Sequence, residues 1–334
     1  MAAGPIPGVV ERLLLARYET GGGTGLVAKA EELFAQQVAT WPRMRAGVEA
    51  LGTARLKALD CGRYTAFLQF NPQRIVSTAA RTDAASIRER KCFLCPAHLP
   101  DEQRGILYGG DHLLLANPAP ILDHHFTIPH VQHLPQALEG SLDVFLGLAA
   151  DLAPHYTVFY NGPRCGASAP DHLHFQAAPR GSIPAEQLAG LARASDAART
   201  IGAAALRVPE GYDRAVVTLE AEQAAQVGEA LRRLLAAARS VLGGIEEPMV
   251  NVLAWREGAA FRTVVFFRSK HRPDAYFREG EERIVVSPAA VDIGGLVVTP
   301  VEKDFQAIDA PALRGIFREV SLDAGLLRRI VEAA

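Results

Sequence analysis

Three polar residues alternate along one short stretch of the chain: His172, His174 and Gln176. On a β-strand, side chains two residues apart point to the same face, so this spacing predicts a shared face for all three. Small residues precede them at Gly162 and at 166–168, and such residues let backbone N–H groups approach an anion. An unprotonated imidazole nitrogen beside a bound phosphate can attack its phosphorus and hold the group covalently. The stretch therefore predicts phosphoryl or nucleotidyl transfer.

Two histidines on a half-exposed strand are often no more than polar surface residues, but the run from Asn161 to Gln176 carries more information. Its sequence, NGPRCGASAPDHLHFQ, resembles the histidine triad (HIT) superfamily, in the transferase branch whose third histidine is replaced by glutamine. That branch includes galactose-1-phosphate uridylyltransferase, the diadenosine tetraphosphate phosphorylases and the GDP-sugar phosphorylases. The resemblance is strongest over residues 92–176, and residues 249–305 look like the C-terminal part of bacterial ATP adenylyltransferase-like proteins.

The resemblance implies that His174 is the catalytic nucleophile. We expect its second ring nitrogen to be held by a backbone carbonyl, which leaves the attacking nitrogen unprotonated. Gln176 can donate hydrogen bonds to the nonbridging oxygens of the transferred group, but an amide cannot protonate a leaving group. Leaving groups that need little protonation, such as a sugar phosphate or a nucleotide, are therefore favoured. Phosphate or a sugar 1-phosphate is the expected acceptor.

A second constellation is the pair Cys92 and Cys95, whose spacing is typical of a zinc knuckle. A redox role is the alternative, but no thioredoxin-like βαβ pattern surrounds the pair. In bacterial galactose-1-phosphate uridylyltransferases, a structural zinc is held by such a pair, a downstream histidine and the first histidine of the His-x-His-x-Gln motif. The resemblance thus implies His133 and His172 as the other two ligands, with His130 as the alternative to His133. A zinc on His172 would fix the start of the catalytic strand.

Further polar residues are candidates for substrate binding. The resemblance assigns Asn161, which precedes the glycine turn, and Ser168, a phosphate contact beside Gly166. Arg164 is either a phosphate ligand or an ordinary surface arginine. Two more candidates, Asn71 and Arg74, follow a predicted strand. A basic cluster predicts either a solvated turn or a phosphate-acceptor site. Its members are Arg268, Lys270, His271 and Arg272.

The composition narrows the class of protein. A chain of 334 residues with 49% hydrophobic content can bury a large core, as one domain or as two fused halves. Its formal charge of -2 gives no general attraction for nucleic acid or for an anionic membrane. No apolar run is long enough for a membrane span, so we expect a cytoplasmic protein. Any phosphate recognition must therefore be local.

Hydrophobic periodicity predicts the elements that position these residues. Residues 1–60 have helical spacing, as do 135–152 and 221–242. Strands are expected at 64–70, 112–117, 124–128, 155–160, 249–255 and 261–267, with a further short segment at 284–286. The pattern predicts an α+β fold, HIT-like, with a mainly antiparallel sheet covered by helices.

The two parts of the chain echo each other weakly. The segment 125–129 is followed by histidines, and the segment 263–271 has the same strand-then-basic-turn form. Two fused HIT-like half-barrels are known in the resembled branch, so we expect an N-terminal helical segment at 1–60, a catalytic half with the zinc site at 61–182 and a second half at 183–334. We expect both halves to share one site.

These observations predict an enzyme, a nucleotidyltransferase or phosphorylase that acts on a nucleoside diphosphate sugar with phosphate or a sugar 1-phosphate as acceptor. A dinucleoside polyphosphate is the main alternative substrate. The second alternative is a nucleotide-binding protein without turnover, against which intact His174 and Gln176 argue. The expected partners are thus a nucleotide and phosphate, with a homodimer left open as an assembly.

Overall fold

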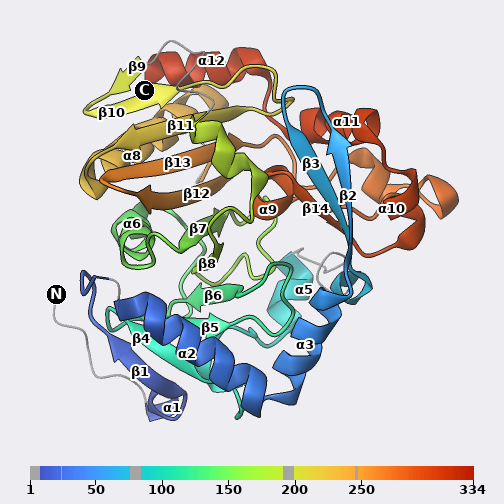
Figure 1. The fold of residues 1–334 in the computed structure, drawn as a ribbon. Helices are drawn as coiled ribbons and strands as arrows, with labels where there is room; N and C mark the ends of the chain where they lie inside the picture. The colour runs from blue at the N-terminus through green and yellow to red at the C-terminus, as the bar shows by residue number, and fades with distance from the viewer. Residues whose placement is uncertain (1–7, 24, 76–83, 191–198, 245–246) are drawn as a thin grey trace.

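The computed structural model describes residues 8–23, 25–75, 84–190, 199–244 and 247–334 (Figure 1). The expected α+β fold with a mainly antiparallel sheet is confirmed. Among the described residues, the main sheet has eleven strands. In spatial order they are β1 (Leu14–Tyr18), β4 (Gly105–Tyr108), β5 (His112–Ala116), β6 (Phe126–Pro129), β8 (His174–Pro179), β7 (Tyr156–Asn161), β12 (Val250–Glu257), β13 (Ala260–Phe267), β11 (Val216–Ala221), β10 (Ala204–Arg207) and β9 (Arg199–Ile201).

Two successive parts of this sheet have the same topology. In residues 105–179, three strands of a meander are followed by helix α6 (Leu142–Asp151) and a strand pair, with spatial order β4-β5-β6-β8-β7. In residues 199–267, helix α8 (Ala224–Leu242) has the same place, and the order is β9-β10-β11-β13-β12. We call these two parts of the sheet the two halves. They join where β7 pairs with β12 in antiparallel register. The counterpart of β13 is therefore the histidine-bearing β8, and not the segment 125–129 with which the sequence comparison paired it.

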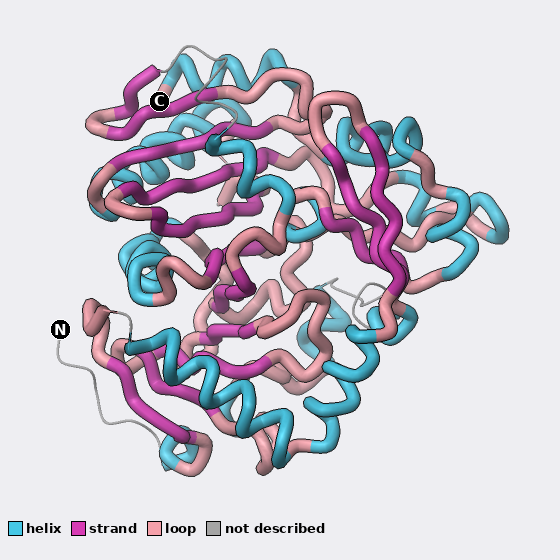
Figure 2. Tube along the Cα trace, viewed as in Figure 1, coloured by secondary structure: helices cyan, strands magenta, loops and turns pink. Residues whose placement is uncertain are grey.

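Helices cover one face of the main sheet (Figure 2), because their apolar stripes pack against alternate strand residues. They are α2 (Gly25–Thr40), α6, α8 and α12 (Ala324–Ala333). Leu33, Phe145, Leu231 and Ile330 from these four helices are fully or almost fully buried in one core cluster. Within the described residues, no helix combines the length and the apolar character needed to cross a membrane.

A second, three-stranded sheet packs against the other face. It consists of β14 (Leu296–Thr299), β3 (Thr65–Phe70) and β2 (Arg55–Asp60), with β14 parallel to β3. Leu68 and Val297 from these strands share a core cluster with Trp255 of the main sheet. The helices beside it are α9 (Ala290–Ile293), α10 (Glu302–Ala307) and α11 (Ala310–Val320).

Short helices occupy connections between these elements. They are α1 (Gly8–Glu11), α3 (Pro42–Gly52) and α5 (Ala84–Glu89), together with 3-10 turns at Pro72–Arg74, Pro96–His98, Glu139–Ser141, Pro184–Gln187, Asp274–Phe277 and Gly280–Glu282.

The helical expectation for residues 1–60 holds for α2 and α3 but misses two strands, β1 and β2. Strand β1 pairs in parallel with β4 at the sheet edge, a long-range pairing that periodicity does not reveal. The segment 284–286 is not a strand; the next strand is β14. Because β3 pairs with β14, part of the expected 61–182 unit lies in a sheet with part of the expected 183–334 unit. The boundaries of the three expected segments stay predictions.

A buried polar network crosses the junction of the two halves. Asn251 on β12 is fully buried, and its Nδ2 donates to Asn161 Oδ1 at 2.9 Å and to the Cys165 carbonyl at 2.7 Å. Its Oδ1 accepts from Arg268 Nη1 at 2.7 Å. Burial lowers the pKa of Arg268. Each of the five guanidinium donors of Arg268 nevertheless has an oxygen acceptor, which offsets the cost of burying the charge.

We predict that Asn251→Ala lowers the free energy of unfolding by about 2–4 kcal/mol, because it leaves a buried Arg268 donor and the Cys165 carbonyl without their partner. Urea denaturation measures this. As a control, Gln306→Ala removes an exposed amide and should change stability by less than about 0.5 kcal/mol. Equal stability of the two variants would contradict the role of the network.

Candidate active site

His174 opens strand β8 and is held on two sides. Its Nδ1 lies 2.8 Å from the His172 carbonyl oxygen, so the ring proton resides on Nδ1 and is donated there. Within the described part of the chain, Nε2 has no hydrogen-bond partner. Burial lowers the pKa of His174 to about 4, so the ring is neutral at pH 7. A neutral imidazole with an unprotonated Nε2 is the form that attacks phosphorus.

Gln136, a residue that sequence reasoning missed, fixes the backbone of His174. Its Oε1 accepts from the His174 N–H at 2.8 Å. Its Nε2 donates to the carbonyls of Asn161 at 2.9 Å and His174 at 3.1 Å. The side chain thus ties the start of β8 to the end of β7. Gln136 lies in the connection before α6, and its local sequence gives no signal of this contact.

His125 was also missed, and it sets the orientation of the Gln176 amide. The Oε1 of Gln176 lies 2.9 Å from His125 Nε2, which donates to it. Burial lowers the pKa of His125 to about 4, so the ring carries one proton. Because Oε1 is used in this contact, the amide N–H groups of Gln176 remain for a substrate oxygen. His125 reaches Gln176 because β6 pairs with β8. The sequence does not reveal this long-range pairing, so it gave no signal for the role of His125.

Segments from both halves line one pocket, which we call the central pocket. Gln176 lies in its wall, whereas His174 is 3% exposed and is not a lining residue. The polar lining residues are Arg74, His125, Asn161, Ser168 and Gln176 from the N-terminal part, and His271, Arg272, Ser287 and Asp292 from the C-terminal part. The expectation of one shared site agrees with this arrangement.

The glycine turn contacts the second half directly. Gly166 has φ of 104°, a backbone conformation that favours glycine. A Cβ at this position would lie 2.6 Å from the Cα of Ala289, which precedes α9. Only glycine therefore lets the turn approach this closely. Asn161 holds the same junction, since its Oδ1 accepts from the Ala290 N–H at 2.7 Å.

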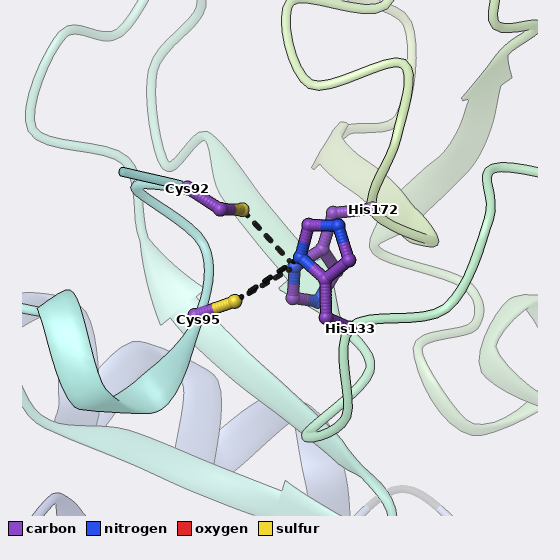
Figure 3. A group of neighbouring side chains, drawn as sticks. All are labelled: Cys92, Cys95, His133 and His172. Carbon is purple, nitrogen blue, oxygen red and sulfur yellow. Dashed lines mark hydrogen bonds between the residues drawn. The ribbon is translucent and has the colours of Figure 1, made fainter. Parts of the chain in front are cut away.

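Four side chains converge beside the start of β8 (Figure 3). The ligand atoms of Cys92, Cys95, His133 and His172 all lie within 4.8 Å of one another. Sulfur-to-Nδ1 distances are 3.2 Å for Cys92 to His172 and for Cys95 to His133, and 3.6 Å for Cys95 to His172. Tetrahedral zinc with usual bond lengths places such atoms about 3.5 Å apart. The donor set and its geometry fit a metal ion.

Both histidines of this cluster have acceptors for their other ring nitrogen. His172 Nε2 donates to the His130 carbonyl at 2.8 Å, and His133 Nε2 lies 3.3 Å from an Asp171 oxygen. These contacts turn Nδ1 inward, as outer hydrogen bonds do around metal ligands. His130 thus contributes its carbonyl while His133 joins the cluster. Burial and the neighbouring Cys92 raise the pKa of Cys95 to about 11, so a cation must displace its proton.

The remaining candidates from the sequence lie in different places. Arg268 is buried at the junction, with backbone carbonyls and Asn251 as its partners. Lys270 pairs with Asp274 and Glu319, and exposed Arg164 donates to the Glu247 carbonyl. Asn71 is buried. None of these four lines the central pocket, whereas Arg74 does.

Comparison with known proteins concerns mainly the fold. A family model described as a domain of unknown function (DUF4922) matches residues 33–179, and no curated protein matches the chain. Yeast Ap4A phosphorylase Apa2 matches with a TM-score of 0.58 and 17% identity, over 90% of this chain and 96% of that chain. The complex of the yeast protein with Ap4A matches with a TM-score of 0.57 and 17% identity, over 89% of this chain and 97% of that chain. An ADP-glucose phosphorylase from Arabidopsis thaliana is a more distant match, with a TM-score of 0.36 and 14% identity, over 81% of this chain and 100% of that chain. The chain shares the fold of the yeast protein.

The two buried histidines predict a pH dependence of stability. In the unfolded chain their rings bind a proton below about pH 6.5, but in the folded chain only below a pKa of about 4 for His125 and His174. Stability that is present above pH 6.5 is therefore lost as the pH falls toward 4. We expect each ring to lower the free energy of unfolding by about 2 kcal/mol between pH 7 and 4.5.

Urea denaturation of His174→Asn at both pH values isolates one ring, and its loss on acidification should be smaller than that of the wild type by this amount. His155 is exposed, so His155→Asn should keep the wild-type dependence. An identical pH dependence in the wild type and His174→Asn would contradict the prediction.

Proposed function

We propose that this protein, which has the fold of the histidine triad transferases, transfers nucleotidyl groups through a covalent intermediate on His174. The observation that carries the proposal is the state of the His174 ring: Nδ1 is held by the His172 carbonyl at 2.8 Å, and burial lowers the pKa to about 4. The nucleophile is thus neutral and directed at physiological pH. His174 is 3% exposed, and Gln176, two residues further along the same strand, lines the central pocket.

The reaction has two displacements. In the first, His174 Nε2 attacks the α-phosphorus of a nucleotide, the P–N bond forms, and the anhydride P–O bond breaks as the leaving phosphate departs. In the second, an oxygen of the acceptor phosphate attacks the same phosphorus. The P–N bond breaks and neutral His174 is regenerated. No step requires a proton donor when both the leaving group and the acceptor are phosphates.

Gln176 has the supporting role. His125 occupies its Oε1, so its N–H groups are available to the nonbridging oxygens of the transferred group. The neighbouring Gly166 and Ser168 line the same pocket and can present backbone N–H groups to phosphate.

Two substrate classes are consistent with this chemistry. The sequence favoured a nucleoside diphosphate sugar as the substrate. Because the chain shares its fold with yeast Ap4A phosphorylase over 90% of its length, a dinucleoside polyphosphate is the first substrate to test. Both give a nucleotidyl group on His174, and they differ only in the leaving group.

We propose zinc as the ion of the Cys92, Cys95, His133 and His172 cluster. All four positions of a tetrahedral ion would be filled by protein, so its role would be structural. The segment just before Cys92 also contacts the turn before β8, because Arg90 Nη2 donates to the Ser168 carbonyl at 2.6 Å. Metal binding would thereby stabilise the start of β8 and the turn before it.

The proposed activity predicts that turnover depends on a phosphate-bearing acceptor. With inorganic phosphate, a dinucleoside tetraphosphate should give a nucleoside diphosphate and a triphosphate, and a nucleoside diphosphate sugar should give a nucleoside diphosphate and a sugar 1-phosphate. Product analysis by chromatography, with and without phosphate, measures this. We expect phosphate to increase the rate at least tenfold over water, since no group protonates a poor leaving group.

Nucleoside monophosphate as the main nucleotide product of a nucleoside diphosphate sugar, at a rate independent of phosphate, would indicate a hydrolase and contradict the proposal. Gln176→His supplies a titratable donor and should shift the products toward hydrolysis.

The zinc site makes a separate prediction. Purified protein should contain about one zinc per chain, and the double variant Cys92→Ser, Cys95→Ser should contain none. Its melting temperature should fall, because metal binding contributes to folding free energy. Elemental analysis and thermal denaturation measure both quantities.

Cys61 is a buried cysteine that does not belong to the cluster, so Cys61→Ala serves as the control and should keep its zinc. Wild-type protein without zinc, or full zinc content in the double variant, would rule out the site.

A further inference from the structure

The C-terminal part of the chain contributes a small polar group to the central pocket. His271, Arg272 and Ser287 all line it. Arg272 Nε donates to Ser287 Oγ at 2.9 Å, and Ser287 Oγ lies 3.1 Å from His271 Nε2. The catalytic assignment to His174 and Gln176 uses none of these three residues.

The direction of the hydrogen bonds in this group is fixed. Arg272 can only donate, so the serine oxygen accepts from it and the serine proton is left for His271. Burial and the nearby guanidinium groups of Arg272 and Arg268 lower the pKa of His271 to about 3. The ring is therefore neutral, and its Nε2 can accept the serine proton. Ser287 and His271 together hold Arg272 by its Nε.

The flat face of Arg272 is held as well. Its guanidinium carbon lies 4.2 Å from the centre of the Tyr276 ring, a cation–π contact. A guanidinium fixed at Nε and at one face loses little further freedom when it binds an anion. The edge that carries the two terminal nitrogens is the edge with which arginine binds phosphate in a bidentate manner.

Arg74, from the N-terminal part, is a second cation in the same pocket, and its Nη1 donates to the Ala119 carbonyl at 2.6 Å. Asp292 is the acidic residue of the lining. Its two oxygens accept from the backbone N–H groups of Val298 at 2.9 Å and Ala289 at 3.0 Å. Burial raises the pKa of Asp292 to about 6. The carboxylate also attracts the Arg74 guanidinium. The lining residues thus include two guanidinium groups and one carboxylate, and this excess of positive charge favours an anion in the pocket.

We propose that Arg272, oriented by Ser287 and His271, forms with Arg74 a subsite for the phosphate dianion of the acceptor. The inference rests on the proposed function and deepens it: the transferred group binds beside Gln176, and the second phosphate binds to the residues of the C-terminal part. The ligand is a tetrahedral phosphate group, either inorganic phosphate or the phosphate of a sugar 1-phosphate.

The test separates the two displacements in the full-length protein. Diadenosine tetraphosphate without acceptor forms the adduct, and its discharge is then followed against the concentration of inorganic phosphate or, separately, glucose 1-phosphate. Arg272→Gln should raise the half-saturating concentration of the acceptor about 10-fold to 100-fold, the range for loss of a charge-assisted hydrogen bond. Adduct formation should change by less than about threefold. The acceptor that shows the larger shift is the one that the subsite binds.

The matched control is Arg278→Gln, which removes an exposed arginine of the same segment and should leave both steps unchanged. Ser287→Ala removes only the support of Arg272, so it should raise the half-saturating concentration less but in the same direction. This second variant decides the question if Arg272→Gln melts at a much lower temperature. An unchanged half-saturating concentration, or equal slowing of both displacements, would overturn the subsite.

If wild-type protein forms no adduct, the proposed function fails, and equilibrium binding of inorganic phosphate decides the subsite alone. Calorimetry should then show phosphate binding to the wild type and to Arg278→Gln, with at least tenfold weaker binding to Arg272→Gln. Equal binding to all three proteins would overturn it.

Discussion

The buried guanidinium of Arg268 is the constraint around which the site is arranged. Its acceptors come from Asn251, from the turn after β13 and from the segments beside α9 and α11. A buried charge without such partners would cost several kcal/mol, so these segments must close around it together. Asn251 in turn fixes Asn161, which is the last residue of β7 and precedes the glycine turn. The geometry of the pocket is therefore coupled to the packing of the two halves.

The two halves share a topology but differ in the connection between their last two strands. The connection between β7 and β8 spans residues 162–173 and contains the glycine turn and His172, whereas β12 and β13 are joined through residues 258 and 259 alone. A two-residue connection is too short to contain a counterpart of the glycine turn between β7 and β8. The second half therefore supplies residues that follow its strands to the central pocket, which it shares with the first half. Gly166 makes this contact possible, since a larger residue would collide with Ala289.

Local patterns predicted much of this arrangement. The α+β class, the strands at the histidine motif and the long helix, expected at 221–242 and found at 224–242, follow from periodicity and a glycine stop. The side chains of Cys92, Cys95, His133 and His172 were expected together from the resemblance, and the structure brings them together. Long-range pairing was not predictable: β1 beside β4, β14 beside β3, and the positions of His125 and Gln136 all depend on which segments become neighbours. Arg268 shows the same limit, because a basic run does not reveal which member is buried.

The central claim is that each chain forms one covalent nucleotidyl adduct, on His174. Intact-mass spectrometry of protein mixed with diadenosine tetraphosphate in the absence of acceptor, followed by peptide mapping, measures it most directly. The account predicts one added nucleoside monophosphate per chain, labile to acid as a phosphoramidate is, located on His174 and absent from His174→Ala. An adduct that persists in His174→Ala, two adducts per chain, or no adduct with any nucleotide substrate that the protein turns over would contradict it.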